Sequence, residues 1–164
     1  MRKCVRCTTG EWPQRVVGGR AVTYELVESP GAVDWSALSA LYSASGLQPK
    51  TPVDLETAFS NSRYVCFAFE DGRLVGAGRV LADGVDCAYI ADLAVDPERQ
   101  GSGIGTAMLA RLLERSRGHR KIILYTVPGR EDFYRNFGFR RMRTAMAIFD
   151  DPDRALSAGL VDES

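Results

Sequence analysis

The segment from Val95 to Thr106 reads VDPERQGSGIGT. An apolar run from Cys87 to Val95 leads into it, and apolar residues at helical spacing follow from Ile104 to Arg117. A strand therefore ends here, a glycine-rich loop follows, and a helix begins. The first turn of a helix presents unpaired amide N–H groups, and glycine lets a ligand approach the backbone closely. We expect this stretch to bind an anion such as a diphosphate.

Single residues in this stretch exclude three other glycine motifs. The Walker pattern fails because no Gly-Lys-Ser/Thr follows the glycines. The dinucleotide pattern G-x-G-x-x-G would need a glycine where Thr106 stands, and the nucleophile elbow G-x-S-x-G would need one at Gln100. The pattern that fits is Q-x-x-G-x-G, formed by Gln100, Gly103 and Gly105.

Strand-like and helix-like patterns alternate on both sides of the glycine-rich stretch. Asp71-Gly72 and Asp83-Gly84 are expected hairpin turns between three apolar runs. The expected helices run from a cap at Asp34 to a stop at Gly46, onward from a cap at Thr51 with Pro52 in the first turn, and over 104–117 and 131–137. The expected strands are 22–27, 64–69, 74–81, 87–95, 121–127 and 140–149. This order predicts an α+β fold with a mixed, mostly antiparallel central sheet flanked by helices, in which the segment 88–127 supplies the parallel unit.

Two motifs resemble the signatures of one enzyme family. The Q-x-x-G-x-G pattern after LAVDP is similar to the coenzyme A signature of the GNAT superfamily of N-acetyltransferases. DFYRNFGF, from Asp132 to Phe139, resembles the second signature of that family. The resemblance implies the GNAT acyl-CoA N-acyltransferase fold over 21–149 and acetyl-CoA as co-substrate. Val127-Pro128-Gly129 departs from the family pattern, because many members carry an asparagine shortly after the penultimate strand.

The resemblance also assigns the residues expected to hold coenzyme A. The pantetheine arm would run beside Leu93, Ala94 and Val95, using their backbone as an added strand would. The pyrophosphate would meet the backbone of the glycine-rich loop, whose expected contacts are Gln100, Gly101, Ser102, Gly103, Ile104, Gly105 and Thr106.

Transfer of an acetyl group to an amine needs a base, an oxyanion donor and an acid. By resemblance, Tyr134 is the acid that protonates the leaving thiolate, with a buried aromatic packed near the cofactor as the alternative. A backbone N–H around Leu93 would meet the oxyanion. Asp92 is a candidate base or amine contact, and the alternative is a structural hydrogen bond or a bulge carboxylate. Tyr24, Trp35 and Tyr42 are candidates for an acceptor pocket, with core packing as the alternative.

Three functions follow from these motifs. The first is an acetyl-CoA-dependent N-acetyltransferase acting on a primary amine of a small molecule, aromatic or aliphatic. The second is acetylation of a protein or peptide at its N-terminus or at a lysine. The third is a non-catalytic, CoA-binding regulatory module. A homodimer is an open expectation, because sheet-edge dimers are common in the family.

Composition bears on the partners, metal content and location of the protein. The chain has 164 residues and no formal net charge, which gives no electrostatic case for nucleic acid or a membrane surface as partner. Cys4 and Cys7 form a C-x-x-C without the second close pair that a zinc site needs, so no metal is expected. Residues 1–20 are expected to be a loosely packed extension without a secretory signal, 150–164 a tail, and the protein cytoplasmic.

Overall fold

The computed structural model describes residues 23–162. The Cys4-x-x-Cys7 segment, the expected 1–20 extension and the first residue of the expected strand 22–27 lie outside this range. The chain divides into two compact units, up to Ile122 and from Ile123 onward. The strands are β1 Glu25–Val27, β2 Tyr64–Glu70, β3 Arg73–Ala82, β4 Cys87–Val95 and β5 Lys121–Ile123. The helices are α1 Trp35–Ala44, α2 Pro52–Ser60, α3 Ile104–Arg115, α4 Glu131–Arg135 and α5 Pro152–Ser157, with 3-10 turns at Pro30–Ala32 and Pro97–Arg99.

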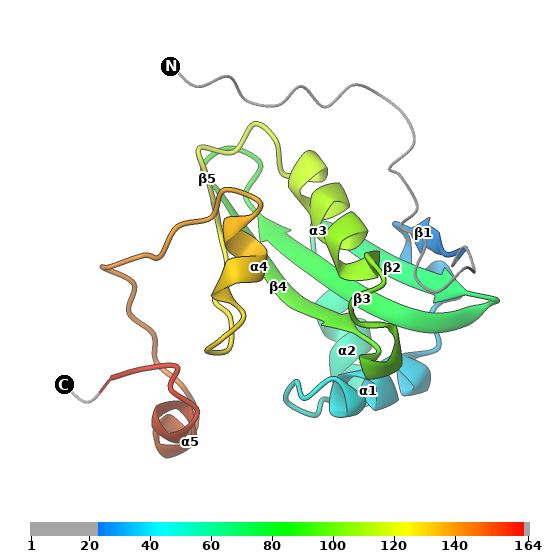
Figure 1. Cartoon of the computed structure of the whole chain (residues 1–164), viewed down its shortest axis with the longest axis horizontal. Helices are drawn as coiled ribbons and strands as arrows, with labels where there is room; N and C mark the ends of the chain where they lie inside the picture. Colours follow the sequence, from blue (N-terminus) through cyan, green and yellow to red (C-terminus); the bar gives the residue numbers. More distant parts are fainter. Residues whose placement is uncertain (1–22, 163–164) are drawn as a thin grey trace. The chain divides into compact units, whose positions relative to one another are not determined.

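The sheet has the strand order β1-β2-β3-β4-β5, and its first four strands pair antiparallel (Figure 1). Asp71 and Gly72 both have positive φ, 49° and 76°, as a tight hairpin turn with the twist of its strands requires. Before β5, the amides of Arg120 and Lys121 donate to the carbonyls of Val85 and Asp86. The two partners advance together along the chain, so this edge is parallel and the sheet is mixed, as the sequence predicted.

Short polar residues begin the first two helices at the positions that the sequence predicted. The Asp34 carboxylate accepts hydrogen bonds from the amides of Ser36 and Ala37, at 2.8 and 3.3 Å. The Thr51 hydroxyl accepts from the Asp54 amide at 3.1 Å, and Pro52 occupies the first turn. These caps satisfy amides that the helices cannot pair internally.

Helices cover both faces of the sheet. In Figure 1, α1 and α2 lie on one face and α3 on the other. The main core on the first face contains Leu38, Leu41, Tyr42, Leu55, Phe59, Val65 and Phe67. On the other face, two glycines of β3 let α3 approach: a Cβ on Gly76 would lie 2.7 Å from Met108 Sδ, and one on Gly78 would lie 3.1 Å from Leu112 Cδ1. Of the apolar positions predicted at helical spacing on α3, Ile104, Met108 and Leu112 are buried, whereas Ala107 and Leu113 are only partly buried. Leu109 is also buried.

The second unit differs most from the sequence-based expectation. The strand expected over 121–127 ends at Ile123, and the strand expected over 140–149 is wrong, because no strand forms there. Met146 and Ile148, which gave that segment its apolar character, are fully exposed. The expected tail after residue 150 contains α5, which Asp151 caps by accepting from the Arg154 amide at 2.9 Å.

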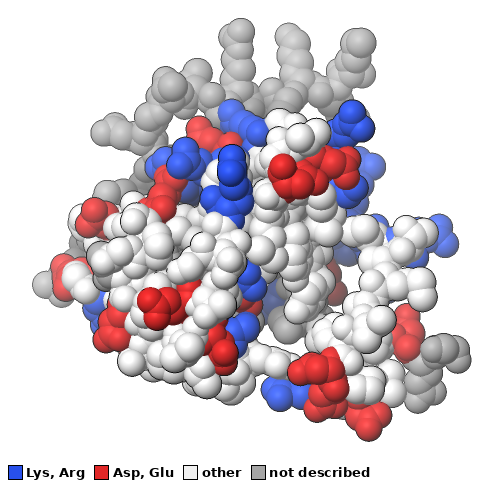
Figure 2. Space-filling view, turned by 180° about the vertical axis from the view of Figure 1, so that it is seen from behind, with Lys and Arg blue, Asp and Glu red and all other residues white. Residues whose placement is uncertain are grey.

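Figure 2 shows Lys and Arg together with Asp and Glu on the face that it presents. No helix within residues 23–162 is long and apolar enough to cross a membrane.

Candidate functional site

The glycine-rich loop enters α3 with its backbone in the left-handed region. Gly101 has φ 80° and Gly103 has φ 95°, values that residues with a Cβ rarely adopt. Gly103 is the N-cap of α3, and its carbonyl accepts from the Ala107 amide at 3.0 Å. The amides that precede this bond, those of Ile104, Gly105 and Thr106, have no acceptor within the helix. Several of the expected diphosphate contacts are therefore brought together at one helix start.

Side chains before the loop attach it to the β2–β3 hairpin. The Asp96 amide donates to the Val75 carbonyl at 2.9 Å, and the Asp96 carboxylate pairs with Arg73. Arg99 Nε donates to Glu70 Oε2 at 2.5 Å. That hydrogen bond and the charge of Glu70 raise the pKa of the Arg99 guanidinium. These contacts connect the residues just before the glycines to the β2–β3 hairpin.

The end of β4 has β3 as a partner strand on one side. Ala94 pairs with Ala77 and Val95 with Gly76. β5 has three residues and begins beside the Val85–Asp86 turn, so it extends for about 10 Å, whereas Leu93 lies about 20 Å along β4 from Cys87. Measured along β4, its neighbour in the sheet, β5 therefore ends before it reaches the level of Leu93. The pantetheine arm is predicted to pair with the backbone of 93–95 as an added strand would.

Asp92 occupies a β-bulge immediately before residues 93–95. Two residues, Asp92 and Leu93, lie opposite the single residue Gly78, between the regular pairs Ala91–Arg79 and Ala94–Ala77. Asp92 has φ 55°, unusual for a residue with a side chain. Its carboxylate accepts from Lys50 Nζ at 2.9 Å and from Arg79 Nε at 2.6 Å.

The protonation state of Asp92 follows from these two cations. Burial alone would raise the pKa of the carboxyl, but the hydrogen bonds and charges of Arg79 and Lys50 outweigh it, so the pKa lies below its ordinary value. The carboxylate is therefore ionised at neutral pH and is a weak base. This geometry favours the bulge carboxylate that the sequence left open as an alternative.

Tyr134 lies in α4, in the second unit. Its ring packs edge-on against Phe133 and Phe139, with centroids 5.0 and 6.0 Å apart. Burial raises the pKa of the phenol, and a hydrogen bond with Thr126 and the charge of Arg130 offset only part of that shift. The hydroxyl therefore keeps its proton at neutral pH, as a general acid must.

The structure does not assemble the three aromatic candidates for an acceptor pocket. Tyr42 has no exposed surface, and its hydroxyl donates to the Asp92 carbonyl at 3.1 Å. Trp35 packs on Phe59 and Phe67, with centroids 6.0 and 6.5 Å apart. Tyr24 directly precedes β1, which lies three strand positions, about 14 Å, from β4. Tyr42 therefore belongs to the core, Trp35 is partly buried against that core, and Tyr24 is distant from the bulge. The acceptor pocket stays a prediction.

Sequence reasoning missed Lys50 and Arg79. Lys50 is separated from Asp92 by 42 residues, and no local pattern links them. Arg79 did carry a signal, because it is the one charged residue within the apolar run from Leu74 to Leu81. A charge in a central strand needs a partner, and Asp92 is the carboxylate in the next strand.

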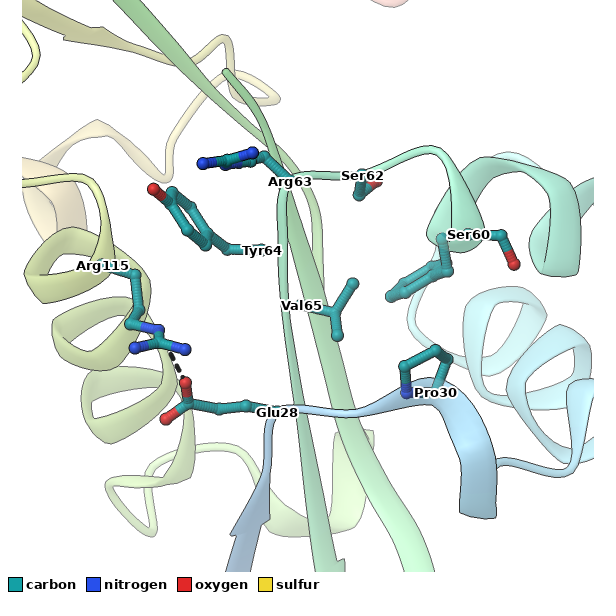
Figure 3. A pocket seen from close by; sticks show the side chains of 9 residues that line it. Glu28, Pro30, Ser60, Ser62, Arg63, Tyr64, Val65 and Arg115 are labelled. Atoms are coloured by element: carbon teal, nitrogen blue, oxygen red, sulfur yellow. Dashed lines mark ion pairs between the residues drawn. The ribbon is translucent and has the colours of Figure 1, made fainter. Parts of the chain in front are cut away.

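A recess of about 200 Å³ lies elsewhere in the first unit, where β1 ends beside β2 (Figure 3). Arg115 Nε pairs with Glu28 at 2.8 Å, and the guanidinium groups of Arg63 and Arg115 lie 5.9 and 5.8 Å from the centre of the Tyr64 ring. None of the residues predicted for coenzyme A, catalysis or the acceptor lines this recess.

Metal ligands are not clustered in the described part of the chain, where no group of three or more His, Cys, Asp and Glu side chains could hold an ion. Cys66 is buried, and burial raises the pKa of its thiol to about 12. Cys87 is partly exposed.

Comparison with known proteins identifies the family. The model of the acetyltransferase (GNAT) family matches residues 34–139, which include both motifs. The chain belongs to the GNAT family. The fold and family that the two motifs implied are therefore confirmed.

Named relatives show which members this chain resembles. It is 32% identical over 122 residues to serotonin N-acetyltransferase 2, chloroplastic, from rice, covering 71% of this chain and 61% of the relative. It is 34% identical over 130 residues to a histone acetyltransferase from Glycine max, covering 70% and 55%. The matched region thus spans less than two thirds of either relative. A Staphylococcus aureus protein described as a probable acetyltransferase has the same fold, with a TM-score of 0.71 at 21% identity, over 79% of this chain and 99% of that protein.

Proposed function

We propose that the protein is an N-acetyltransferase that passes the acetyl group of acetyl-CoA to a primary amine of a small molecule. The observation that carries this proposal is the family match over 34–139 together with the glycine-capped start of α3. Members of this family use acetyl-CoA as co-substrate. The unpaired amides of the first turn suit a diphosphate, because a helix N-terminus favours anions.

The residues proposed to hold acetyl-CoA fall into two groups. Leu93, Ala94 and Val95 would pair with the pantetheine through their backbone, at the part of β4 that β5 does not cover. The diphosphate would be bound by the loop, through Gln100, Gly101, Ser102, Gly103, Ile104, Gly105 and Thr106. Besides its proposed role at the diphosphate, Gln100 makes one hydrogen bond to β4: its side-chain amide donates to the Val95 carbonyl at 3.3 Å. That bond connects the loop to the strand end.

The chemistry is direct attack of a neutral amine on the thioester through a tetrahedral intermediate. An ammonium group has a reference pKa of about 10.4 and must release its proton to solvent before the neutral nitrogen can attack. The amide of Leu93 would donate to the oxyanion. Tyr134 would give its proton to the departing sulfur. The raised pKa of its phenol keeps the hydroxyl protonated until that step.

The acceptor is proposed to be a small amine, with an aromatic amine first. The rice relative is named for serotonin, which supports a small aromatic acceptor. The soybean relative is named for histones, which keeps a protein lysine as the second candidate. The experiment must therefore include both classes.

A thiol-release assay with purified protein and acetyl-CoA tests the proposal. The panel contains aromatic amines, aliphatic amines, aminoglycosides, amino acids, and peptides with a free N-terminus or lysine. Thiol release that depends on a small amine supports the proposal, and release with peptides alone favours a protein acetyltransferase. Binding of CoA without turnover on any acceptor would identify a regulatory module.

A homodimer and a cytoplasmic location remain predictions. The exposed apolar side chains of the second unit include Met142, Met146 and Ile148, which a second copy of the chain could cover. Light scattering during size-exclusion chromatography measures the oligomeric state directly, and a monomer at micromolar concentration would exclude the dimer.

A further inference from the structure

The bulge in β4 is held by contacts from several elements of the first unit. Asp92 has φ 55°, a left-handed backbone that residues with a Cβ rarely adopt. Such a conformation persists only where its surroundings impose it. The bulge therefore depends on the three side chains that reach Asp92, namely Lys50, Arg79 and Tyr42.

Each cation that reaches Asp92 is itself positioned by a second contact. Lys50 directly precedes the cap of α2, and its carbonyl accepts from the Ser39 hydroxyl of α1 at 2.7 Å. Its ammonium group lies 5.2 Å from the centre of the Tyr42 ring. Arg79 also donates to the Ser62 hydroxyl at 3.3 Å. The helices α1 and α2 are thus connected to one residue of β4.

Charge and burial argue against proton transfer at Asp92. One carboxylate faces two cations, and both of its oxygens accept hydrogen bonds. The side chains of Asp92, Arg79 and Lys50 are only 15, 14 and 29% exposed, so solvent screens their attraction weakly. A general base works best with a pKa near the working pH. A carboxylate held between two cations does not meet that condition.

We propose that Lys50, Asp92 and Arg79 form a positioning cluster that fixes the bulge, and with it the direction of the Leu93 amide. Asp92 accepts no proton in the reaction. The inference rests on the proposed function, in which the Leu93 amide donates to the oxyanion. Loss of the cluster misdirects that donor, so it slows the chemical step and leaves the binding of acetyl-CoA intact.

Lys50→Met tests the cluster, because it removes one cation and keeps a chain of similar length. Removing an oxyanion donor costs roughly 100- to 1000-fold in kcat, so a misdirected donor should cost at least about tenfold. The KM for acetyl-CoA and the Kd of CoA should stay within about threefold of the wild type. Lys50→Arg keeps the positive charge and should retain most of the wild-type kcat. Lys121→Met is the matched control, since Lys121 pairs with Asp86 at 2.5 Å on the surface.

The pH profile separates positioning from general base catalysis. If Asp92 were the base, removal of Lys50 would raise the pKa of its carboxyl and move the acidic limb of kcat/KM to higher pH. The positioning cluster predicts that this limb does not move. Asp92→Asn is the second variant, because asparagine tolerates the left-handed backbone but leaves both cations without a charged partner. It should show the same fall in kcat with unchanged CoA affinity.

A readout without turnover keeps this inference separate from the proposed function. The NMR amide signals of Leu93 and Ala94 should shift or broaden in Lys50→Met and remain unchanged in Lys121→Met. An unchanged kcat in Lys50→Met, a moved acidic limb, or unchanged amide signals would each overturn the inference. If the wild type turns over no amine but these signals still move, the proposed function fails and the bulge assignment stands.

Discussion

Replacement of Gly103 by alanine separates the cost of backbone strain from the loss of a binding site. Gly103 has φ 95°, and a Cβ built there meets no atom within 4 Å. Alanine therefore clashes with nothing, and its cost is the left-handed backbone, about 1–2 kcal/mol. In a chain of this size each kcal/mol lowers the melting temperature by about 2–4 °C.

Gly118 provides the matched control at the other end of α3. It has φ 98°, and a Cβ there also meets no atom within 4 Å. Gly118→Ala should therefore lose the same stability as Gly103→Ala. Of these two glycines, Gly103 belongs to the loop expected to bind the diphosphate, and Gly118 does not.

Calorimetric titration of CoA into the two variants measures the difference. Gly103→Ala should weaken binding at least tenfold, which corresponds to about 1.4 kcal/mol, whereas Gly118→Ala should bind as the wild type does. The titration is run well below both melting temperatures, so that unfolding does not contribute. Equal Kd values for the two variants would refute the assignment of the loop to the diphosphate.

Three further substitutions test other parts of the account. Tyr134→Phe should lower kcat by roughly 100- to 10,000-fold with little change in CoA affinity. Because burial raises the pKa of the phenol, any alkaline limb that this group causes in wild-type activity should lie above the range of an ordinary tyrosine. An unchanged kcat would exclude Tyr134 as the acid. Burial alone would raise the pKa of the Asp92 carboxyl, but Arg79 and Lys50 hold it below its ordinary value, so the ionised form stabilises the fold above that ordinary value and the contribution is lost as the pH falls through the folded-state pKa. Asp92→Asn should therefore lose less stability than the wild type between pH 6 and pH 3, as urea unfolding measures, and an equal loss would contradict the ion pairs. Gly78→Ala places a Cβ 2.9 Å from Leu93 Cδ1 and 3.1 Å from Leu112 Cδ1 and should destabilise by about 1–3 kcal/mol, whereas a neutral effect would contradict the close packing of α3.

Local patterns were sufficient for the elements that depend on nearby residues. Helix caps at Asp34 and Thr51 and the turn at Asp71-Gly72 involve partners within four positions, so the sequence contains all the information that they need. The glycine-rich loop belongs to the same class. Its conformation follows from Gly101 and Gly103, because few other residues adopt their φ angles.

Local patterns could not predict contacts between residues that lie far apart in the sequence. The apolar residues of 140–149 predicted a strand, but a strand forms only where a neighbour pairs with it, and that depends on the whole sheet. Tyr42 and Trp35 show why an acceptor pocket is hard to predict from the sequence, because aromatic side chains suit both pockets and cores. Lys50 could be connected to Asp92 only after α1 and α2 were placed on the sheet.

The most direct test of the central claim is a mass balance of the acetyl group in a single reaction. Protein, acetyl-CoA labelled with ¹³C in the acetyl group, and the best amine of the panel are incubated, and free CoA and acetylated amine are measured by mass spectrometry. Direct transfer predicts one labelled acetyl-amine for each CoA released, with Gly103→Ala reducing both at limiting acetyl-CoA and Gly118→Ala reducing neither. Release of CoA with the label recovered as acetate, or no label on any amine while CoA still binds, would contradict the account.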